Sequence, residues 1–371
     1  MRGRARPAYA VTVSGAENAF TSALLTRVLA AAHRNQPGVE GEWGLAVPLT
    51  RRRRALDALE RLGAHARFAR RHYEPELAGP ALAEIVAHAD GLAAAADLFA
   101  DDASRELLLD VLVARVLGEH HTRLPVSQRD FRDAAERIVP EAENVERNRD
   151  GTPLHRYRLG DVRLIGLAFM VHEFFGEEQY ALDRGGIRVA AEPGDVVVDA
   201  GGGWGETALY FADAVGDGGR VVAFEFVPDN LRLLEANLAL NPRLRERVHV
   251  VPHPTWHTAG EPLRFDAAGA QTALAEQGRS EVLTQSIDSV CDGMRVDLIK
   301  LDVEGAEMAT LRGAEQTIRA HRPKLALSVY HSIDDFVDIP AWVDGLDLGY
   351  RLYLDHRWPG PAETILFAQP A

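Results

Sequence analysis

Three glycines and two carboxylates form the group of residues whose chemistry is clearest from the sequence. Gly201, Gly203 and Gly205 follow a short apolar run and come directly before a helical stretch. Glycine lets a backbone turn tightly and approach a ligand, and the first turn of a helix offers free N–H groups and a positive dipole end. Asp199 precedes this loop, and Glu225 ends the next apolar run. The pattern predicts a cofactor-binding loop at the end of a strand.

The spacing within the loop favours S-adenosylmethionine over a dinucleotide. A dinucleotide loop has a third glycine where this chain has Glu206. Glu206 and Asp199 would repel a pyrophosphate, whereas S-adenosylmethionine has no phosphate and carries an ammonium and a sulfonium. Glu225 can accept hydrogen bonds from both ribose hydroxyls, which either cofactor contains. The residues expected to bind S-adenosylmethionine are Asp199, Gly201, Gly203, Trp204, Gly205, Glu225, Phe226 and Asp302.

Polar residues at the ends of later strands are the candidates for catalysis. Asp302, His331 and His356 each follow an apolar run, and the ends of these strands are expected to face one crevice. Transfer of the methyl group from a sulfonium is an in-line displacement, and an acceptor atom that carries a proton must also lose it. Histidine is the commonest general base because its pKa is near neutral. We therefore predict that Asp302, His331 and His356 are catalytic; the alternative for each histidine is a structural role.

The same strand ends raise two further expectations. Asp302, Glu304 and the histidines are plausible ligands of a divalent cation that would acidify a hydroxyl, but their spacing matches no metal motif, so no metal ligands are assigned. Lys300 is one of only two lysines in the chain, the other being Lys324. We predict that Lys300 forms a buried ion pair with a nearby carboxylate.

The elements that position these residues alternate from about residue 190 onward. Short β-branched runs alternate with helical stretches, which predicts a doubly wound, Rossmann-like α/β sheet of seven strands. The predicted strands are residues 196–199, 221–225, 248–251, 296–302, 324–330, 350–354 and 364–368. The predicted helices are residues 205–214, 228–240 and 307–319.

The region upstream is predicted to be mostly helical. We expect a helical N-terminal domain at residues 1–150, a connector at 151–190 and the S-adenosylmethionine-binding domain at 191–371. The first domain is expected to cap the acceptor site or to form an oligomer interface. Asp102 is the predicted N-cap of one helix, and Gly118 its end.

Two other upstream segments allow two interpretations each. The basic cluster at residues 51–54 is either a solvated helix face or an anion-binding patch. Phe174, Phe175, Gln179 and Tyr180 either pack over the edge of the following domain or contact a ligand.

Composition narrows the class of protein. The chain has 371 residues, of which 46% are hydrophobic, enough for a sizeable core. Its formal net charge of −14 disfavours a nucleic-acid partner. The lone cysteine, Cys291, cannot form an internal disulfide, and no apolar stretch is long enough to span a membrane. We expect a cytoplasmic protein without a membrane partner.

Over roughly residues 195–368 the chain resembles the FkbM family of methyltransferases. The resembling segments are residues 198–206, 223–228, 237–241, 298–307, 311–313, 330–331 and 353–356. The resemblance implies a class I methyltransferase fold and methylation of hydroxyl oxygens on sugars, natural products and related small molecules. Many family members have Ala-Asn where this chain has Gly202 and Gly203, and Trp204 replaces a smaller apolar residue. We expect cofactor binding to survive this difference.

The expected function is thus S-adenosylmethionine-dependent O-methylation of a small hydroxylated acceptor by a possible homo-oligomer. Three alternatives remain: an NAD-dependent oxidoreductase, a non-catalytic cofactor-binding scaffold and a nucleic-acid methyltransferase. The acidic residues of the loop disfavour the first, and the net charge disfavours the last.

Overall fold

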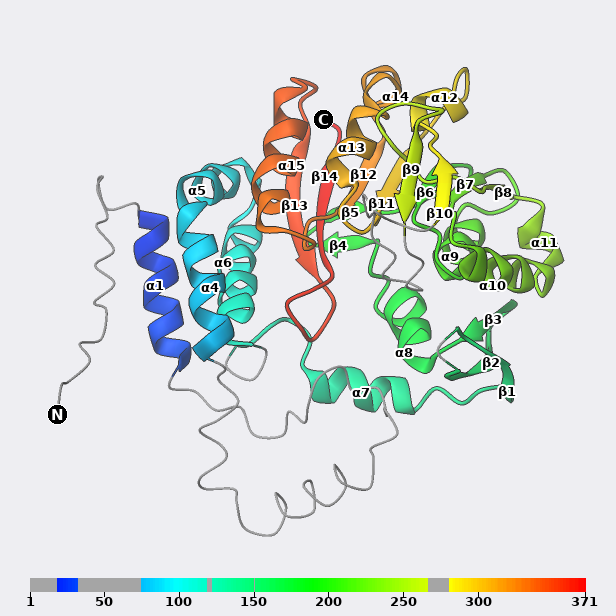
Figure 1. Ribbon diagram of the computed structural model, residues 1–371, viewed down its shortest axis with the longest axis horizontal. Helices are drawn as coiled ribbons and strands as arrows, with labels where there is room; N and C mark the ends of the chain where they lie inside the picture. The colour runs from blue at the N-terminus through cyan, green and yellow to red at the C-terminus, as the bar shows by residue number, and fades with distance from the viewer. Residues whose placement is uncertain (1–18, 33–74, 119–121, 150, 266–279) are drawn as a thin grey trace, which may run out of the picture.

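A seven-stranded sheet forms the centre of the structure, a computed structural model that describes residues 19–32, 75–118, 122–149, 151–265 and 280–371 (Figure 1). The strand order is β13-β14-β12-β11-β6-β7-β8. Five neighbouring strands, from β12 to β8, are parallel, and β14 is antiparallel to both of its neighbours. The strands are β6 (Val196–Ala200), β7 (Arg220–Phe224), β8 (Val248–Val251), β11 (Leu298–Leu301), β12 (Lys324–Ser328), β13 (Arg351–His356) and β14 (Thr364–Gln369). The predicted seven-stranded α/β class is confirmed.

The sheet separates two hydrophobic clusters because successive side chains of each strand point to opposite faces. In β6, Val198 belongs to one cluster and Val197 to the other, and in β7 Val222 and Val221 divide in the same way. Both faces are therefore covered, which explains the near-continuous apolar runs of these strands. The helices that follow the strands are α9 (Glu206–Ala214), α10 (Pro228–Ala239), α11 (Pro242–Arg245), α12 (Ile287–Val290), α13 (Glu307–Arg312), α14 (Glu315–His321) and α15 (Ile333–Gly345).

The N-terminal helices share a core with this sheet. Leu108 and Leu112 are fully buried in the same cluster as Leu352 and Leu354 of β13. These helices are α1 (Ala19–Ala32), α4 (Pro75–Ala87), α5 (Ala89–Leu98) and α6 (Asp102–Leu117), whereas α7 (Gln128–Glu136) packs through Phe131 against His172 and Trp358. The hydrophobic core thus crosses the predicted boundary at residue 150, and the division into domains stays a prediction.

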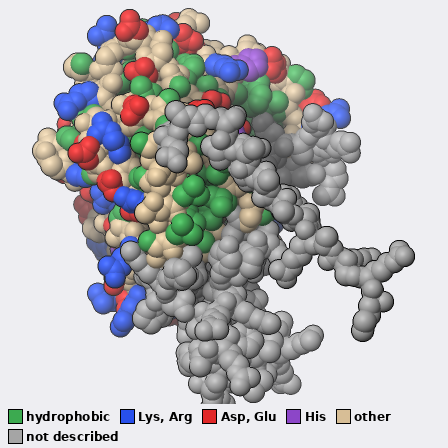
Figure 2. Space-filling view, turned by 90° about the vertical axis from the view of Figure 1, so that its left-hand side faces the viewer, with side chains coloured by type: hydrophobic (Ala, Val, Ile, Leu, Met, Phe, Trp, Pro, Cys, Tyr) green, Lys and Arg blue, Asp and Glu red, His purple; other side chains and the backbone are tan. Residues whose placement is uncertain are grey.

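The N-terminal helices leave some hydrophobic side chains exposed at the surface. Figure 2 shows the side of the molecule on which α1 lies, where hydrophobic side chains gather beside residues that are not described. Two leucines of α1, Leu25 and Leu29, are exposed. Within the described part of the chain, no helix is both long and apolar enough to cross a membrane.

Residues 142–189 contain more structure than a connector. They form the strands β1 (Ala142–Arg147), β2 (Pro153–Leu159) and β3 (Val162–Gly166), the short helices α8 (Ala168–Val171) and η1 (His172–Gly176), and the hairpin β4 (Leu182–Arg184) and β5 (Ile187–Val189). Asn237 of α10 bonds both the N–H and the carbonyl of Ile165, and Asn241 does the same for Arg163. The side-chain amides of Asn237, in α10, and Asn241, between α10 and α11, thus take the place of a neighbouring strand along the edge of β3.

Several predicted boundaries are wrong. Asp101, not Asp102, caps α6, since its carboxylate accepts a bond from the N–H of Ser104 at 2.8 Å. The helix predicted at 307–319 is two helices, and Gly313 lies between them. A glycine is needed there because a Cβ would lie 2.0 Å from the carbonyl oxygen of Trp256. The prediction also omitted α15 and the strand pair β9 (Pro262–Phe265) and β10 (Ser280–Leu283). The basic cluster at 51–54 lies outside the described residues.

Candidate functional site

The glycine loop lies between the ends of two strands. The N–H groups of Gly201 and Gly202 donate to the carbonyl oxygen of Phe224 at the end of β7, at 3.1 and 2.8 Å. On the other side, a Cβ on Gly201 would lie 1.8 Å from the carbonyl oxygen of Asp302, and the residue has φ +86°. Only glycine fits this position, both for its backbone conformation and for its contact with the segment after β11.

A buried ion pair between Lys300 and Asp199 contacts the backbone of the glycine loop. Lys300 Nζ lies 3.1 Å from Asp199 Oδ1, and both side chains are almost fully buried. The ammonium also donates to the carbonyl oxygens of Ala200 and Gly201, at 3.2 and 2.6 Å. Burial alone would lower the pKa of Lys300, but the charges of Asp199 and Asp302 raise it above its ordinary value. The predicted ion pair of Lys300 is confirmed.

Above the loop is a cavity of about 270 Å³, close to the lower end of the roughly 300–1,000 Å³ typical of small-molecule sites. Six of the expected cofactor residues line it: Gly201, Gly203, Trp204, Glu225, Phe226 and Asp302. Asp199 and Gly205 do not. Asp199 is instead buried beneath the loop, where Thr207 donates to it at 2.7 Å, so it supports the loop rather than facing the cavity.

Glu225 is held rigidly at the end of β7. Its Oε1 accepts bonds from the N–H groups of Phe226 and Val227, both at 2.7 Å, and its Oε2 accepts from the Asn230 amide at 3.2 Å. Asn230 in turn accepts a bond from the indole N–H of Trp204 at 3.1 Å. Burial raises the pKa of Glu225, while the two backbone N–H groups oppose that rise. These contacts orient the carboxylate and the indole as one unit in the cavity wall.

Asp302 is an ionised hydrogen-bond acceptor at the end of β11. The hydroxyls of Tyr180 and Tyr330 donate to its two oxygens at 2.8 and 3.1 Å. Burial would raise the pKa of Asp302, but the charges of Lys300 and His331 lower it below its ordinary value. A carboxylate held in this way can accept a hydrogen bond from a substrate hydroxyl.

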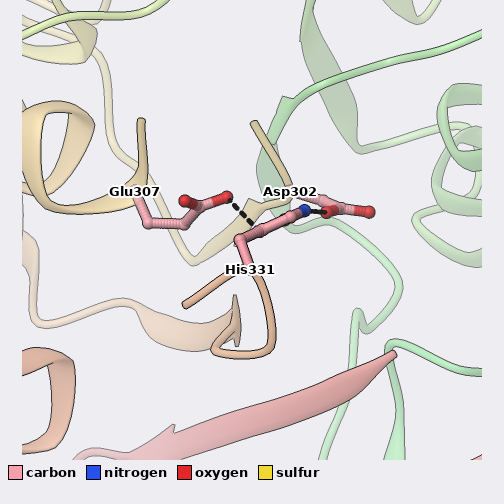
Figure 3. Close-up of side chains that lie close together, drawn as sticks. All are labelled: Asp302, Glu307 and His331. Atoms are coloured by element: carbon pink, nitrogen blue, oxygen red, sulfur yellow. Dashed lines mark ion pairs between the residues drawn. The ribbon is translucent and has the colours of Figure 1, made fainter. Parts of the chain in front are cut away.

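His331 is surrounded by carboxylates (Figure 3). Its Nδ1 lies 3.0 Å from Glu307, and its Nε2 lies 3.5 Å from Glu304 and 3.6 Å from Asp302. Burial would lower the pKa of His331, but Glu304, Glu307 and Asp302 together raise it to about 11. The ring is therefore an imidazolium at neutral pH and has no free nitrogen to accept a proton, which opposes the predicted role of general base.

The same geometry bears on the divalent cation considered from the sequence. Asp302, Glu307 and His331 each offer an atom within 4.8 Å of the others. The two carboxylates, however, face different nitrogens of the ring. With Glu307 3.0 Å from Nδ1 and Asp302 3.6 Å from Nε2, the described arrangement is an imidazolium held between two carboxylates, and no metal is assigned to it.

The third candidate for catalysis, His356, is fully buried at the end of β13 and does not line the cavity. Its Nδ1 shares a hydrogen bond of 2.9 Å with the Thr364 hydroxyl across the strand pair. Burial lowers its pKa to about 4, so the ring is neutral. This placement favours the structural alternative that the sequence left open.

The cavity also contains residues that the sequence did not single out for catalysis or cofactor binding. Glu173 of η1, Glu206 at the start of α9 and Glu363 just before β14 all line it. Burial raises the pKa of Glu206 to about 7, and burial with the charge of Asp302 raises that of Glu363 to about 8. The sequence could have identified Glu206 as a cofactor-binding residue, since it stands where a dinucleotide loop has its third glycine. Glu173 and Glu363 lie outside the recognised motifs.

The segment before the first long strand forms the rest of the wall. Phe174 and Tyr180 line the cavity, which agrees with the ligand-contact interpretation, whereas Phe175 and Gln179 do not. Within the described part of the chain, no residue before Leu167 reaches the cavity. Among the described residues, α8 and η1 contribute to the wall of the cavity, and the N-terminal helices do not.

The fold and the loop define a class of protein, the Rossmann-like methyltransferases. Residues 189–352 match the model of the Methyltransferase FkbM domain. The match covers less than half of the chain, and it confirms the resemblance to the FkbM family of methyltransferases that was expected from the sequence.

Two known proteins illustrate the likeness. The crystal structure of the methyltransferase FkbM from Methylobacillus flagellatus superposes with a TM-score of 0.52 at 20% identity, covering 77% of this chain and 60% of that chain, and so shares the fold. The AMB antimetabolite synthetase AmbE of Pseudomonas aeruginosa is 27% identical over 221 residues, which is 48% of this chain. This chain spans only about a tenth of the length of AmbE.

Proposed function

We propose that the protein transfers the methyl group of S-adenosylmethionine to a hydroxyl oxygen of a small molecule such as a sugar or a natural product. The observation that carries this proposal is the rigid carboxylate of Glu225 beside a glycine loop that contains Glu206. Glu225 would accept bonds from the ribose hydroxyls, and Glu206 would face the ammonium of the methionine part. Both carboxylates disfavour a dinucleotide, whose pyrophosphate they would repel.

In the proposed reaction, Asp302 positions the hydroxyl group of the acceptor. The oxygen of the acceptor attacks the methyl carbon, the bond from carbon to the sulfonium sulfur breaks, and the hydroxyl proton passes along its hydrogen bond to Asp302, which then releases it to water. Asp302, ionised and fixed by Tyr180 and Tyr330, would align the hydroxyl by accepting its hydrogen bond. His331 would act as a positioning residue, because its charge keeps Asp302 ionised.

Isotope labelling tests this proposal. The protein is incubated with S-adenosylmethionine deuterated at the methyl group and with a small-molecule extract, and labelled products are identified by mass spectrometry and NMR. We expect the label in methyl ethers, and its loss in Asp302→Asn. Label found on nitrogen, on carbon, or only in nucleic acid would contradict the proposal.

A further inference from the structure

The two sides of the cavity differ in what they can bind. Glu225 follows β7 and Asp302 follows β11, while Glu363 precedes β14, which runs antiparallel beside β12. The N-terminal end of β14 therefore lies at the same edge of the sheet as the carboxyl end of β11. Because β11 lies between β14 and β7, Asp302 separates the cofactor side from a second side at Glu363. If the cofactor binds at Glu225 as proposed, this second side is left for the acceptor.

The charged side chains of the cavity wall are mostly acidic. Among the described residues, six acidic side chains line the cavity, whereas Lys300 is the only lysine or arginine that does, and Lys300 is already paired with Asp199. The acidic residues are Glu173, Glu206, Glu225, Asp302, Glu304 and Glu363. Proposed cofactor binding uses Glu225 and Glu206, and His331 neutralises part of the charge near Asp302 and Glu304. Glu173 and Glu363 are the two acidic side chains that are paired with neither the proposed cofactor nor His331.

Glu173 is a buried carboxylate without a cationic partner. It is only 5% exposed, yet no residue of the described chain forms an ion pair with it. Its pKa is raised well above the ordinary value, first by burial and then by the charges of Glu363, Asp302 and Glu206 in that order. Gln179 connects the two residues, since its backbone N–H donates to the carbonyl oxygen of Glu173 at 3.2 Å and its side-chain amide donates to the carboxylate of Glu363 at 2.7 Å. This geometry places Glu173 on the same side of the cavity as Glu363. A buried carboxylate is stable in its charged form only with a cation beside it.

Glu363 is held in place by its surroundings. Its backbone has φ +63°, a conformation that residues other than glycine rarely adopt, and its carboxylate accepts a bond from the Gln179 amide at 2.7 Å. Strained backbone of this kind is concentrated at functional sites. The ring of Phe174 is stacked on that of Tyr180 in the same wall, with centroids 6.1 Å apart, and aromatic faces also attract cations.

From these observations we propose that the hydroxyl-bearing acceptor also carries an ammonium group, which binds between Glu173 and Glu363 on the far side of Asp302 from the cofactor. This inference rests on the proposed methyl transfer and names the chemical class of its acceptor. An ammonium ion would supply the missing positive charge and donate up to three hydrogen bonds to the two carboxylates. The hydroxyl of the same molecule would then lie at Asp302, near the methyl group.

Matched pairs of small molecules test the inference without knowledge of the natural acceptor. The protein is first saturated with S-adenosylhomocysteine, and binding is followed by NMR titration with tyramine against 4-ethylphenol and with glucosamine against glucose. Each pair shares a hydroxyl and differs in the ammonium. We expect the ammonium-bearing member to bind roughly tenfold or more tightly, since charge-assisted hydrogen bonds have about that effect.

Two variants complete the test. Glu363→Gln is expected to remove the preference for the ammonium while leaving affinity for S-adenosylmethionine unchanged. Glu192→Gln, a matched change on an exposed residue paired with Lys324, should leave both unchanged. Equal binding within the pairs, no binding of any member, or a loss of S-adenosylmethionine affinity in Glu363→Gln would overturn the inference. Failure of the unmodified protein to bind S-adenosylmethionine would instead reject the proposed function.

Discussion

Lys300 illustrates how one side chain connects the core to the site. Its ammonium is buried against Asp199 and binds two carbonyl oxygens of the glycine loop, so it neutralises a carboxylate that water cannot reach. A buried ion pair of this kind contributes little net stability, but removal of one partner leaves an isolated buried charge.

We predict that Lys300→Met destabilises the fold strongly. The expected loss is about 3–5 kcal/mol in the free energy of unfolding, measured by denaturant titration, because Asp199 would stay buried without its partner. The matched control is Lys324→Met, which removes the chain's other lysine from a more exposed pair with Asp195 and should cost less than about 1 kcal/mol. The prediction fails if the two variants are equally stable.

Glu363 gives the protein a stability that depends on pH. Its pKa is raised to about 8 by burial and by the charge of Asp302, so the folded state binds its proton more tightly than the unfolded chain does. The resulting stabilisation is complete below about pH 4.5 and is lost as the pH rises through about 8.

Glu363→Gln is therefore expected to raise the stability of the cofactor-free protein at pH 8, by roughly 0.5–2 kcal/mol. The amide keeps an oxygen for the bond from Gln179 but carries no charge. Melting temperatures of both proteins between pH 5 and pH 8 measure the effect, and the gain should shrink toward pH 5. A gain that is independent of pH would show that the charge of Glu363 is not its cause.

At the scale of elements, the glycine loop depends on the contact between the ends of β6 and β11. Gly201 touches the carbonyl group of Asp302 so closely that no side chain fits between them. The loop that would hold the cofactor and the carboxylate that would align the acceptor are therefore joined through backbone, and displacement of one moves the other.

We predict that Gly201→Ala abolishes S-adenosylmethionine binding in a protein that still folds. The matched control is Gly194→Ala. Gly194 has φ +91°, similar to the +86° of Gly201, but a Cβ there has no atom within 4 Å. Both variants carry the same backbone strain, of order 1–3 kcal/mol, and only Gly201→Ala adds the clash with Asp302. Circular dichroism and calorimetric titration separate the two effects; equal cofactor affinity would contradict the account.

The elements also show what a sequence can predict. The seven strands and the loop were predictable because each depends on local patterns, namely β-branched runs and glycine spacing. Glu363 was not, because its place at the site follows from the antiparallel direction of β14 beside β12. His356 follows its strand just as Asp302 does, but its full burial depends on packing between distant segments. The charge of His331 likewise depends on three carboxylates that only the fold brings together.

At the scale of the whole molecule, the sheet, its helices and the upstream segment act as one unit. The core continues from the N-terminal helices into the sheet, while η1 and the segment after it supply Glu173, Phe174 and Tyr180 to the cavity. The segment 189–352, which matches the FkbM methyltransferase model, thus supplies the loop, Glu225 and Asp302, and residues on both sides of it complete the cavity. Glu173 and Glu363 both lie outside the matched range, where this chain can differ from its relatives in acceptor.

Calorimetric titration of the whole protein with S-adenosylmethionine and, separately, with NAD tests the central claim most directly. The account predicts that S-adenosylmethionine binds, that NAD does not, and that Glu225→Ala weakens binding by roughly tenfold or more through loss of the ribose contacts. Binding of NAD in place of S-adenosylmethionine, or affinity for S-adenosylmethionine that does not depend on Glu225, would contradict it.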